Sequence, residues 1–270
     1  MRLGIGTYAY MWSIGFPGAA PRAPMNALGL LEKAEALGVN VVQYGPNLSL
    51  STLPEEERGL VVARARERGI RLEVGTRGLE SGNLAVHIEL CGCVGSDFLR
   101  TVPERPDGSV PSAAEVVSAL RPLLPELERA HVRLGMENSR MPAREMRRAL
   151  DELANPSVGV TLDTVNSLAI PEGTREVAEQ LAPWTYCLHV KDFTVRRDWH
   201  MMGFQVEGCA AGQGQLDVAW LLGLLRPYER CQSAILELWP PEQADLESTI
   251  ALEGQWAVES VRYLRTLIPD

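Results

Sequence analysis

The sequence predicts a (β/α)8 TIM barrel, an α/β fold formed by one domain over residues 1–270. Short, apolar, β-rich segments alternate with longer helix-patterned segments along the whole chain, which is typical of repeated βα units and a parallel sheet. Eight such strand segments can be counted, the number that closes a barrel of this kind. Gly38 and Gly69 each end a helical segment and are followed by an apolar segment, as in the turn from a helix back into a barrel strand.

The expected strands are Arg2–Tyr8, Val39–Tyr44, Arg71–Gly75, Phe98–Val102, Arg133–Glu137, Val158–Asp163, Cys187–Val190 and Ala234–Leu238. The expected helices are Ala27–Leu37, Glu55–Arg68, Ser112–Ala130, Ala143–Ala154, Thr174–Leu181, Val218–Leu225 and Ala251–Leu267. The third helix, Ser81–Gly95, contains several glycines and must hold its shape by packing. A doubly wound open sheet is the competing fold, but no Gly-x-Gly-x-x-Gly motif follows the first strand, because Gly4 and Gly6 lie inside it.

Composition excludes several classes of protein. The net charge of −9 argues against an extended nucleic-acid partner, which requires lysine and arginine to neutralise phosphates. No segment approaches the length of a membrane span, and the N-terminus lacks the apolar stretch of a signal peptide. Five cysteines form no Cys-x-x-Cys motif and are expected to stay reduced. We therefore expect a soluble, cytoplasmic protein with no membrane partner.

Four ligand-type side chains stand at the C-terminal ends of successive predicted strands. Glu137, Asp163, His189 and Glu237 each follow apolar residues that would otherwise continue a buried strand. Asp163 follows Glu137 by 26 residues and His189 follows Asp163 by 26, one βα unit in each case. Any one of them could be a helix cap or a core residue, but their recurrence at the rim where barrels build active sites predicts a shared metal. Buried carboxylates require such pairing.

Three carboxylates and one imidazole form an oxygen-rich site. Such a site suits Mn²⁺ best, with Mg²⁺, Co²⁺ or Zn²⁺ as alternatives. We therefore expect one divalent metal, most suitably Mn²⁺.

The chain resembles the xylose isomerase-like TIM-barrel superfamily, which includes sugar isomerases, ketose epimerases, inosose dehydratases and metal-dependent apurinic endonucleases. The resemblance covers essentially the full length, and its strongest segments are Leu72–Gly78, Gly135–Asn138, Leu162–Asn166, His189–Asp192, Gly208–Gly214 and Leu236–Pro241. It implies that Glu137, Asp163, His189 and Glu237 bind one metal. The reaction is not implied, because one set of ligands serves several chemistries.

Further residues are expected to bind or transform the substrate. Lys191 lies two positions after His189 and is expected to reach a substrate oxygen or an enolate. Arginines near the rim suit a substrate carboxylate or phosphate, and Glu73 and two amides suit hydroxyl groups. The predicted substrate-binding residues are Gln43, Asn47, Glu73, Arg77, Arg100 and Arg197. Arg197 belongs to the segment Arg196–Phe204, which we expect to be a loop that closes over the substrate.

The leading hypothesis is a metal-dependent isomerase or epimerase of carbohydrate metabolism, in which Glu137 and Glu237 move protons next to the carbonyl of a small sugar, ketose or sugar acid. The alternative is a lyase, a dehydratase or decarboxylase, on an oxidised sugar acid or inosose. Less favoured are an apurinic endonuclease-like nuclease, because relatives of that kind use several metals and many histidines, and a non-catalytic sugar-binding barrel. Assembly into a homo-oligomer is left open.

Overall fold

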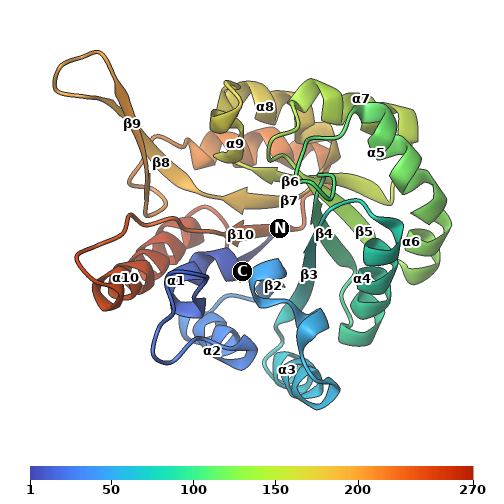
Figure 1. Ribbon diagram of the computed structural model, residues 1–270, viewed down its shortest axis with the longest axis horizontal. Coiled ribbons are helices and arrows are strands. Elements are labelled where there is room, and N and C mark those ends of the chain that lie inside the picture. The colour runs from blue at the N-terminus through green and yellow to red at the C-terminus, as the bar shows by residue number, and fades with distance from the viewer. Residues whose placement is uncertain (270) are drawn as a thin grey trace.

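Eight parallel strands close into a barrel at the centre of the molecule (Figure 1). The computed structural model describes residues 1–269. The strands follow one another around the barrel in chain order, so every connection is a neighbouring βα unit. They are β1 (Arg2–Gly6), β2 (Val41–Tyr44), β3 (Arg71–Arg77), β4 (Phe98–Val102), β5 (Arg133–Glu137), β6 (Val158–Asp163), β7 (Thr185–Val190) and β10 (Ser233–Leu236). The predicted TIM barrel is thereby confirmed.

Helices surround the barrel and bury their apolar faces against it (Figure 1). They are α1 (Met11–Ile14), α2 (Ala27–Leu37), α3 (Glu55–Glu67), α4 (Ser81–Val94), α5 (Ala113–Leu120), α6 (Leu124–Ala130), α7 (Ala143–Leu153), α8 (Thr174–Leu181), α9 (Val218–Leu225) and α10 (Leu246–Arg265). The glycine-containing α4 forms as expected, since Leu84, Ile88 and Cys91 are buried against the barrel. None of the helices in the described chain has the length and apolar character needed to cross a lipid bilayer.

Several predicted boundaries were wrong, and local features explain the two largest differences. The expected helix Ser112–Ala130 is split by a 3-10 turn over Arg121–Leu123, because Pro122 cannot donate the backbone hydrogen bond that a continuous helix needs. The last helix begins at Leu246 rather than Ala251, since the side chain of Asp245 accepts a hydrogen bond from the Ser248 amide and caps it. The first strand ends at Gly6, and a 3-10 turn follows it.

A two-stranded antiparallel hairpin is inserted after β7. It consists of β8 (Asp192–Arg197) and β9 (Phe204–Cys209), which pair with each other and with no barrel strand. In Figure 1 the hairpin extends beyond the outline of the barrel. The expected loop Arg196–Phe204 is therefore the end of a hairpin, with residues 198–203 as its turn. The sequence interpretation missed the alternating pattern of the two strands because it treated the segment as one irregular loop.

Candidate functional site

Four predicted residues meet at the C-terminal end of the barrel. Glu137 and Asp163 are the last residues of β5 and β6, His189 lies in β7, and Glu237 directly follows β10. All four are at most 2 % exposed. Nδ1 of His189 lies 3.3 Å from Oε2 of Glu137, 3.3 Å from Oε1 of Glu237 and 4.0 Å from Oδ2 of Asp163. The βα repeat thus brings together Glu137, Asp163 and His189, which the 26-residue spacing predicted to be neighbours, and the last strand adds Glu237.

The cluster has the composition and spacing of a divalent-metal site. Ligand atoms of Glu137, Asp163 and His189 all lie within 4.8 Å of one another. Nδ1 of His189 is buried and makes no hydrogen bond, and Oδ2 of Asp163, which is also buried, is contacted by the ammonium group of Lys191. An unpartnered buried ring nitrogen is costly, and a cation between it and the carboxylates would remove that cost. The residues present therefore fit one divalent ion with oxygen and nitrogen ligands.

Gln43 on β2 fixes the imidazole of His189 from the other side. Its Oε1 lies 2.8 Å from Nε2 of His189, and its Nε2 donates to Oε2 of Glu73 at 2.9 Å. Because the amide nitrogen of Gln43 faces the carboxylate of Glu73, the amide oxygen faces His189 and accepts its Nε2 proton. The lone pair of Nδ1 is then directed at the carboxylate cluster, as in a metal-binding histidine.

Two buried cations balance the carboxylates. Nζ of Lys191 lies 2.7 Å from Oδ2 of Asp163 and 2.8 Å from Oε2 of Glu237. Nε of Arg100 donates to Oε2 of Glu137 at 2.5 Å, and the same guanidinium donates to the carbonyl oxygen of Thr76 at 3.2 Å. The site is therefore a mixed cluster of buried acids and bases, not an isolated acidic patch.

These contacts set the charge of each group. Burial alone would raise the pKa of Glu137, but Arg100 and then His189 outweigh it and hold the pKa well below its usual range. Burial is the largest effect on Asp163 and raises its pKa. Burial opposes the charge of Lys191, but the carboxylates of Asp163 and Glu237 outweigh it and raise the pKa of its ammonium group. Lys191 is consequently positively charged at neutral pH.

Two asparagines that the sequence analysis gave no role hold the cluster in place. Oδ1 of Asn138 accepts a hydrogen bond from the backbone N–H of Asp163 at 2.6 Å, and Nδ2 of Asn138 donates to the backbone carbonyl oxygen of Asp163 at 2.9 Å. Asn166 donates to Oε1 of Glu137 at 2.8 Å, and its own backbone N–H donates to Oδ1 of Asp163 at 2.8 Å. Their position directly beside the predicted ligands, in Glu-Asn and Asp-Thr-Val-Asn, was the available signal.

A cavity opens above the cluster. Its inner part has a volume of about 140 Å³ and is lined by Tyr8, Arg77, Arg100, Lys191 and Glu237, among others. An outer part of about 590 Å³ shares Tyr8 and Lys191 with it and continues past Arg140 and Trp239 to the surface. Arg77 and Arg100 thus lie where the sequence analysis expected them, and Tyr8 was missed because an aromatic residue at a strand end is common without a function.

The other predicted substrate-binding residues do not face the cavity. Gln43 and Glu73 are buried below the cluster. The amide of Gln43 forms hydrogen bonds with the Glu73 carboxylate and with the imidazole of His189. Asn47 accepts the hydroxyl proton of Thr7 at 2.6 Å and so holds two loops together. Arg197 lies on the hairpin, where it donates to the carbonyl oxygen of Met201 at 2.8 Å. Local sequence could not separate inward-facing polar residues at the rim from those one layer lower in the barrel.

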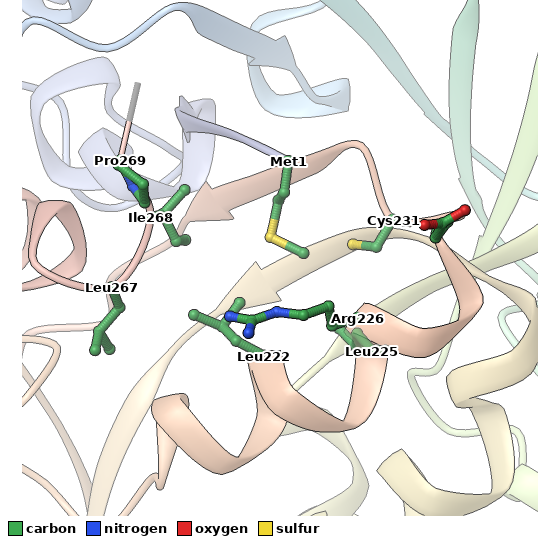
Figure 2. Close-up of a pocket in the computed structure, with 9 residues that line it drawn as sticks. Met1, Leu222, Leu225, Arg226, Cys231, Leu267, Ile268 and Pro269 are labelled. Atoms are coloured by element: carbon green, nitrogen blue, oxygen red, sulfur yellow. The ribbon is translucent and has the colours of Figure 1, made fainter.

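A separate cavity of about 620 Å³ lies at the opposite end of the barrel (Figure 2). Figure 2 shows Met1, Leu222, Arg226 and Ile268 around it, and its other lining residues are also mainly apolar. It contains no cluster of metal-ligating groups within residues 1–269. The candidate metal cluster found in residues 1–269 lies at the C-terminal rim, the end of the barrel where TIM-barrel enzymes build their active sites.

The closed eight-stranded barrel and its buried cluster of Glu, Asp and His side chains place this chain in the class of TIM barrels with a candidate metal site. A family model described as xylose isomerase-like TIM barrel matches residues 14–267, and the chain belongs to that family. It is also 34% identical over 273 residues to a 3-oxo-isoapionate decarboxylase of Pectobacterium atrosepticum, a match that covers 100% of this chain and 97% of the relative.

Solved structures share the fold. A xylose isomerase-like TIM barrel protein of Mycobacterium smegmatis in complex with magnesium superposes with a TM-score of 0.71 at 11% identity, over 96% of this chain and 97% of the other. A D-psicose 3-epimerase of Clostridium cellulolyticum with D-tagatose gives a TM-score of 0.73 at 13% identity, over 99% of each chain. At these identities the likeness establishes the architecture alone.

Proposed function

We propose that this protein is a metal-dependent decarboxylase of a small 3-oxo sugar acid. The full-length match to a decarboxylase at 34% identity supports this reading. The main structural observation behind the decarboxylase proposal is the lining of the inner cavity, where Arg77, Arg100 and Lys191 lie beside the carboxylate cluster. A substrate with both a carboxylate and a carbonyl requires cationic groups for the first and an electrophilic site for the second. The lyase alternative of the sequence analysis is thus favoured over its isomerase hypothesis.

The environment of Glu137 also favours a lyase. Oε2 of Glu137 accepts from Arg100 and Oε1 accepts from Asn166, so both oxygens are engaged. An epimerase needs two carboxylates free to exchange protons with carbon on opposite faces of the substrate. A decarboxylase removes no proton from carbon, so a glutamate held as a fixed anion suits it. Glu137 is therefore proposed as a metal ligand and not as a base.

Glu137, Asp163, His189 and Glu237 would hold the metal, with Mn²⁺ as the proposed ion and Mg²⁺, Co²⁺ or Zn²⁺ as alternatives. When bound, the metal supplies positive charge next to the carbonyl oxygen of the substrate. In a 3-oxo acid the bond between the carboxyl carbon and the neighbouring carbon breaks, and its electron pair passes to the carbonyl as an enolate while CO₂ leaves. One proton must then return to carbon.

The side chains of this chain are assigned to binding and to that proton. Arg77 is half-exposed at the cavity wall, and we assign it to the departing carboxylate. Lys191 is charged and borders both parts of the cavity, so we assign it to the delivery of the proton to carbon. Glu237 is paired with Lys191 at 2.8 Å and is assigned to restore that proton from solvent.

The test is incubation of the Mn²⁺-loaded protein with 3-oxo-isoapionate in D₂O, with CO₂ release and product mass measured together. We expect release of CO₂ and a product with one deuterium on the carbon that carried the carboxylate. The unreacted substrate should stay unlabelled. His189→Ala is the matched control and should contain no stoichiometric metal and release no CO₂. Deuterium exchange into ketoses without CO₂ release would instead support the isomerase hypothesis.

A further inference from the structure

We propose that two copies of this chain form a symmetric dimer in which the hairpin tip of each copy covers the mouth of the other copy's cavity. The hairpin tip is defined here as residues 198–204. The inference concerns assembly, and its first experiment does not depend on the proposed function. It also replaces the expectation that the hairpin closes over the site of its own chain.

The hairpin tip carries the most exposed apolar side chains of the described chain. Trp199 is 93% exposed and Met202 87%, while Met201 and Phe204 are each at least 60% exposed. Monomeric soluble proteins rarely display such a continuous group of large apolar side chains, and it usually marks an interaction surface. Leu60 and Val86, which are also exposed, lie singly on barrel helices and need no partner.

The foot of the hairpin is rigid although its tip is exposed. The carboxylate of Asp192 accepts backbone N–H groups from Gly212, Gly214 and Leu216 at 2.8 to 3.0 Å, which fixes the base of both strands. A Cβ at Gly208 would clash with the backbone of Trp239, so β9 packs tightly there. A two-stranded hairpin alone is marginally stable in water, so an arm that is fixed only at its foot gains stability when its tip is covered.

An apolar groove lies at the foot of the same hairpin. This mouth groove has a volume of about 410 Å³ and is lined by Met11, Trp12, Phe16, Leu238, Trp239 and Pro240. It is continuous with the outer part of the substrate cavity, which also borders Met11, Leu238 and Trp239. Its α1 wall is held by Glu253, whose carboxylate accepts the backbone N–H of Trp12 at 2.8 Å. The groove is therefore preformed and large enough for an indole ring.

The placement of tip and groove favours a second copy as the occupant. The groove runs beside β9 from Val206 to the foot of the hairpin, and Trp199, Met201 and Met202 lie in the turn beyond the two strands. Two hairpins laid antiparallel about a twofold axis place each tip at the foot of the other, so both contacts form at once. This is the self-complementary arrangement of a cyclic dimer.

Charge complementarity supports the same occupant. Arg197, the last residue of β8 directly before the hairpin tip, has no carboxylate partner in residues 1–269 and lies over the ring of Phe204. The segment that follows the groove carries the exposed acids Glu242 and Asp245, and Glu242 has no cationic partner in that part of the chain. The net charge of −9 disfavours an anionic membrane surface as the partner.

The area is adequate for a stable dimer. Each fully covered aromatic side chain buries roughly 150–250 Å². Two tips, together with the groove surfaces they would cover, therefore approach the roughly 1,600 Å² of a standard interface.

Sedimentation velocity of the full chain at about micromolar concentration tests the dimer. Wild type should sediment with twice the 29.7 kDa mass of one chain, and the double variant Trp199→Ala, Met202→Glu should be monomeric with an unchanged circular dichroism spectrum. Leu60→Glu is the matched control, since it changes an exposed apolar residue elsewhere, and should stay dimeric. A monomeric wild type, a dimeric double variant, or flotation of wild type with phosphatidylserine vesicles would overturn the proposal.

Mixing experiments test whether the partner's tip completes the site, and this step rests on the proposed function. The double variant has an intact metal cluster, and His189→Ala has an intact hairpin. If each tip serves the other copy, a mixture of the two should regain activity that neither shows alone, because the active cluster then receives an intact tip. Equal activity of the double variant alone and of wild type would show that the tip covers nothing in the reaction.

Discussion

Oε1 of Gln43 on β2 lies 2.8 Å from Nε2 of His189 on β7, across the interior of the barrel. This contact assigns the proton of the imidazole to Nε2 and leaves Nδ1 free toward the three carboxylates. A residue expected to bind a hydroxyl group of the substrate thus orients a proposed metal ligand.

Gln43→Leu should weaken metal binding about 10–100-fold, the usual effect of losing the partner of a ligating histidine. The leucine keeps the volume but cannot accept the Nε2 proton, so the imidazole can rotate or change tautomer. Calorimetric titration with Mn²⁺ measures the affinity, and the ¹⁵N shifts of His189 report the tautomer. Gln255→Leu on the exposed face of α10 is the control. Unchanged affinity with an unchanged tautomer would refute the orienting role.

Glu237→Gln should keep the fold and abolish turnover. The amide preserves shape but is a poorer metal ligand and cannot carry the proton that Lys191 requires, since Nζ of Lys191 lies 2.8 Å from Oε2 of Glu237. Activity is measured with and without excess Mn²⁺ to separate the two effects. Normal turnover once metal is restored would leave Glu237 as a ligand only.

Arg100→Met should destabilise the metal-free protein by about 3–5 kcal/mol, because it leaves the buried carboxylate of Glu137 without its ion-pair partner. Urea unfolding in the presence of a chelator measures the loss. The double variant Arg100→Met, Glu137→Gln should recover part of it. Arg121→Met removes an exposed pair with Glu152 and should cost less than about 1 kcal/mol. An equal cost for both arginines would contradict the buried ion pair.

Ser112 and Glu115 form a reciprocal hydrogen-bonded capping box at the N-terminus of α5. This box should make the stability of the protein depend on pH in the acid range. Hydrogen bonds from Arg105 and then Ser112 lower the pKa of Glu115 to about 2. The folded pKa lies below the unfolded value of about 4.3, so the stabilisation is complete above the unfolded pKa and is lost as pH falls through 2. The stability difference between wild type and Glu115→Gln, followed by thermal unfolding, should shrink between pH 5 and pH 2. A difference that does not change with pH would contradict the assignment.

The sequence was informative wherever a residue's role followed from its position along one βα unit. The predicted strands coincide closely with the observed ones at β4, β5 and β6, because these segments are apolar, buried and bounded by clear turns. The boundary errors at Pro122 and Asp245 came from local signals that were present but not weighed. The hairpin was missed because its two strands and their turn were interpreted together as one loop after the seventh barrel strand.

The sequence by itself determined the TIM barrel and the meeting of Glu137, Asp163, His189 and Glu237, because parallel strands repeated at regular spacing must present their C-terminal ends on one rim. Only the tertiary structure decided how that rim is used. Gln43 and His189 are 146 residues apart, and Arg100 and Glu137 are 37 apart. Such pairs depend on which side chains face each other across the closed barrel and at what depth, and a local pattern of apolar and polar residues carries no information about either.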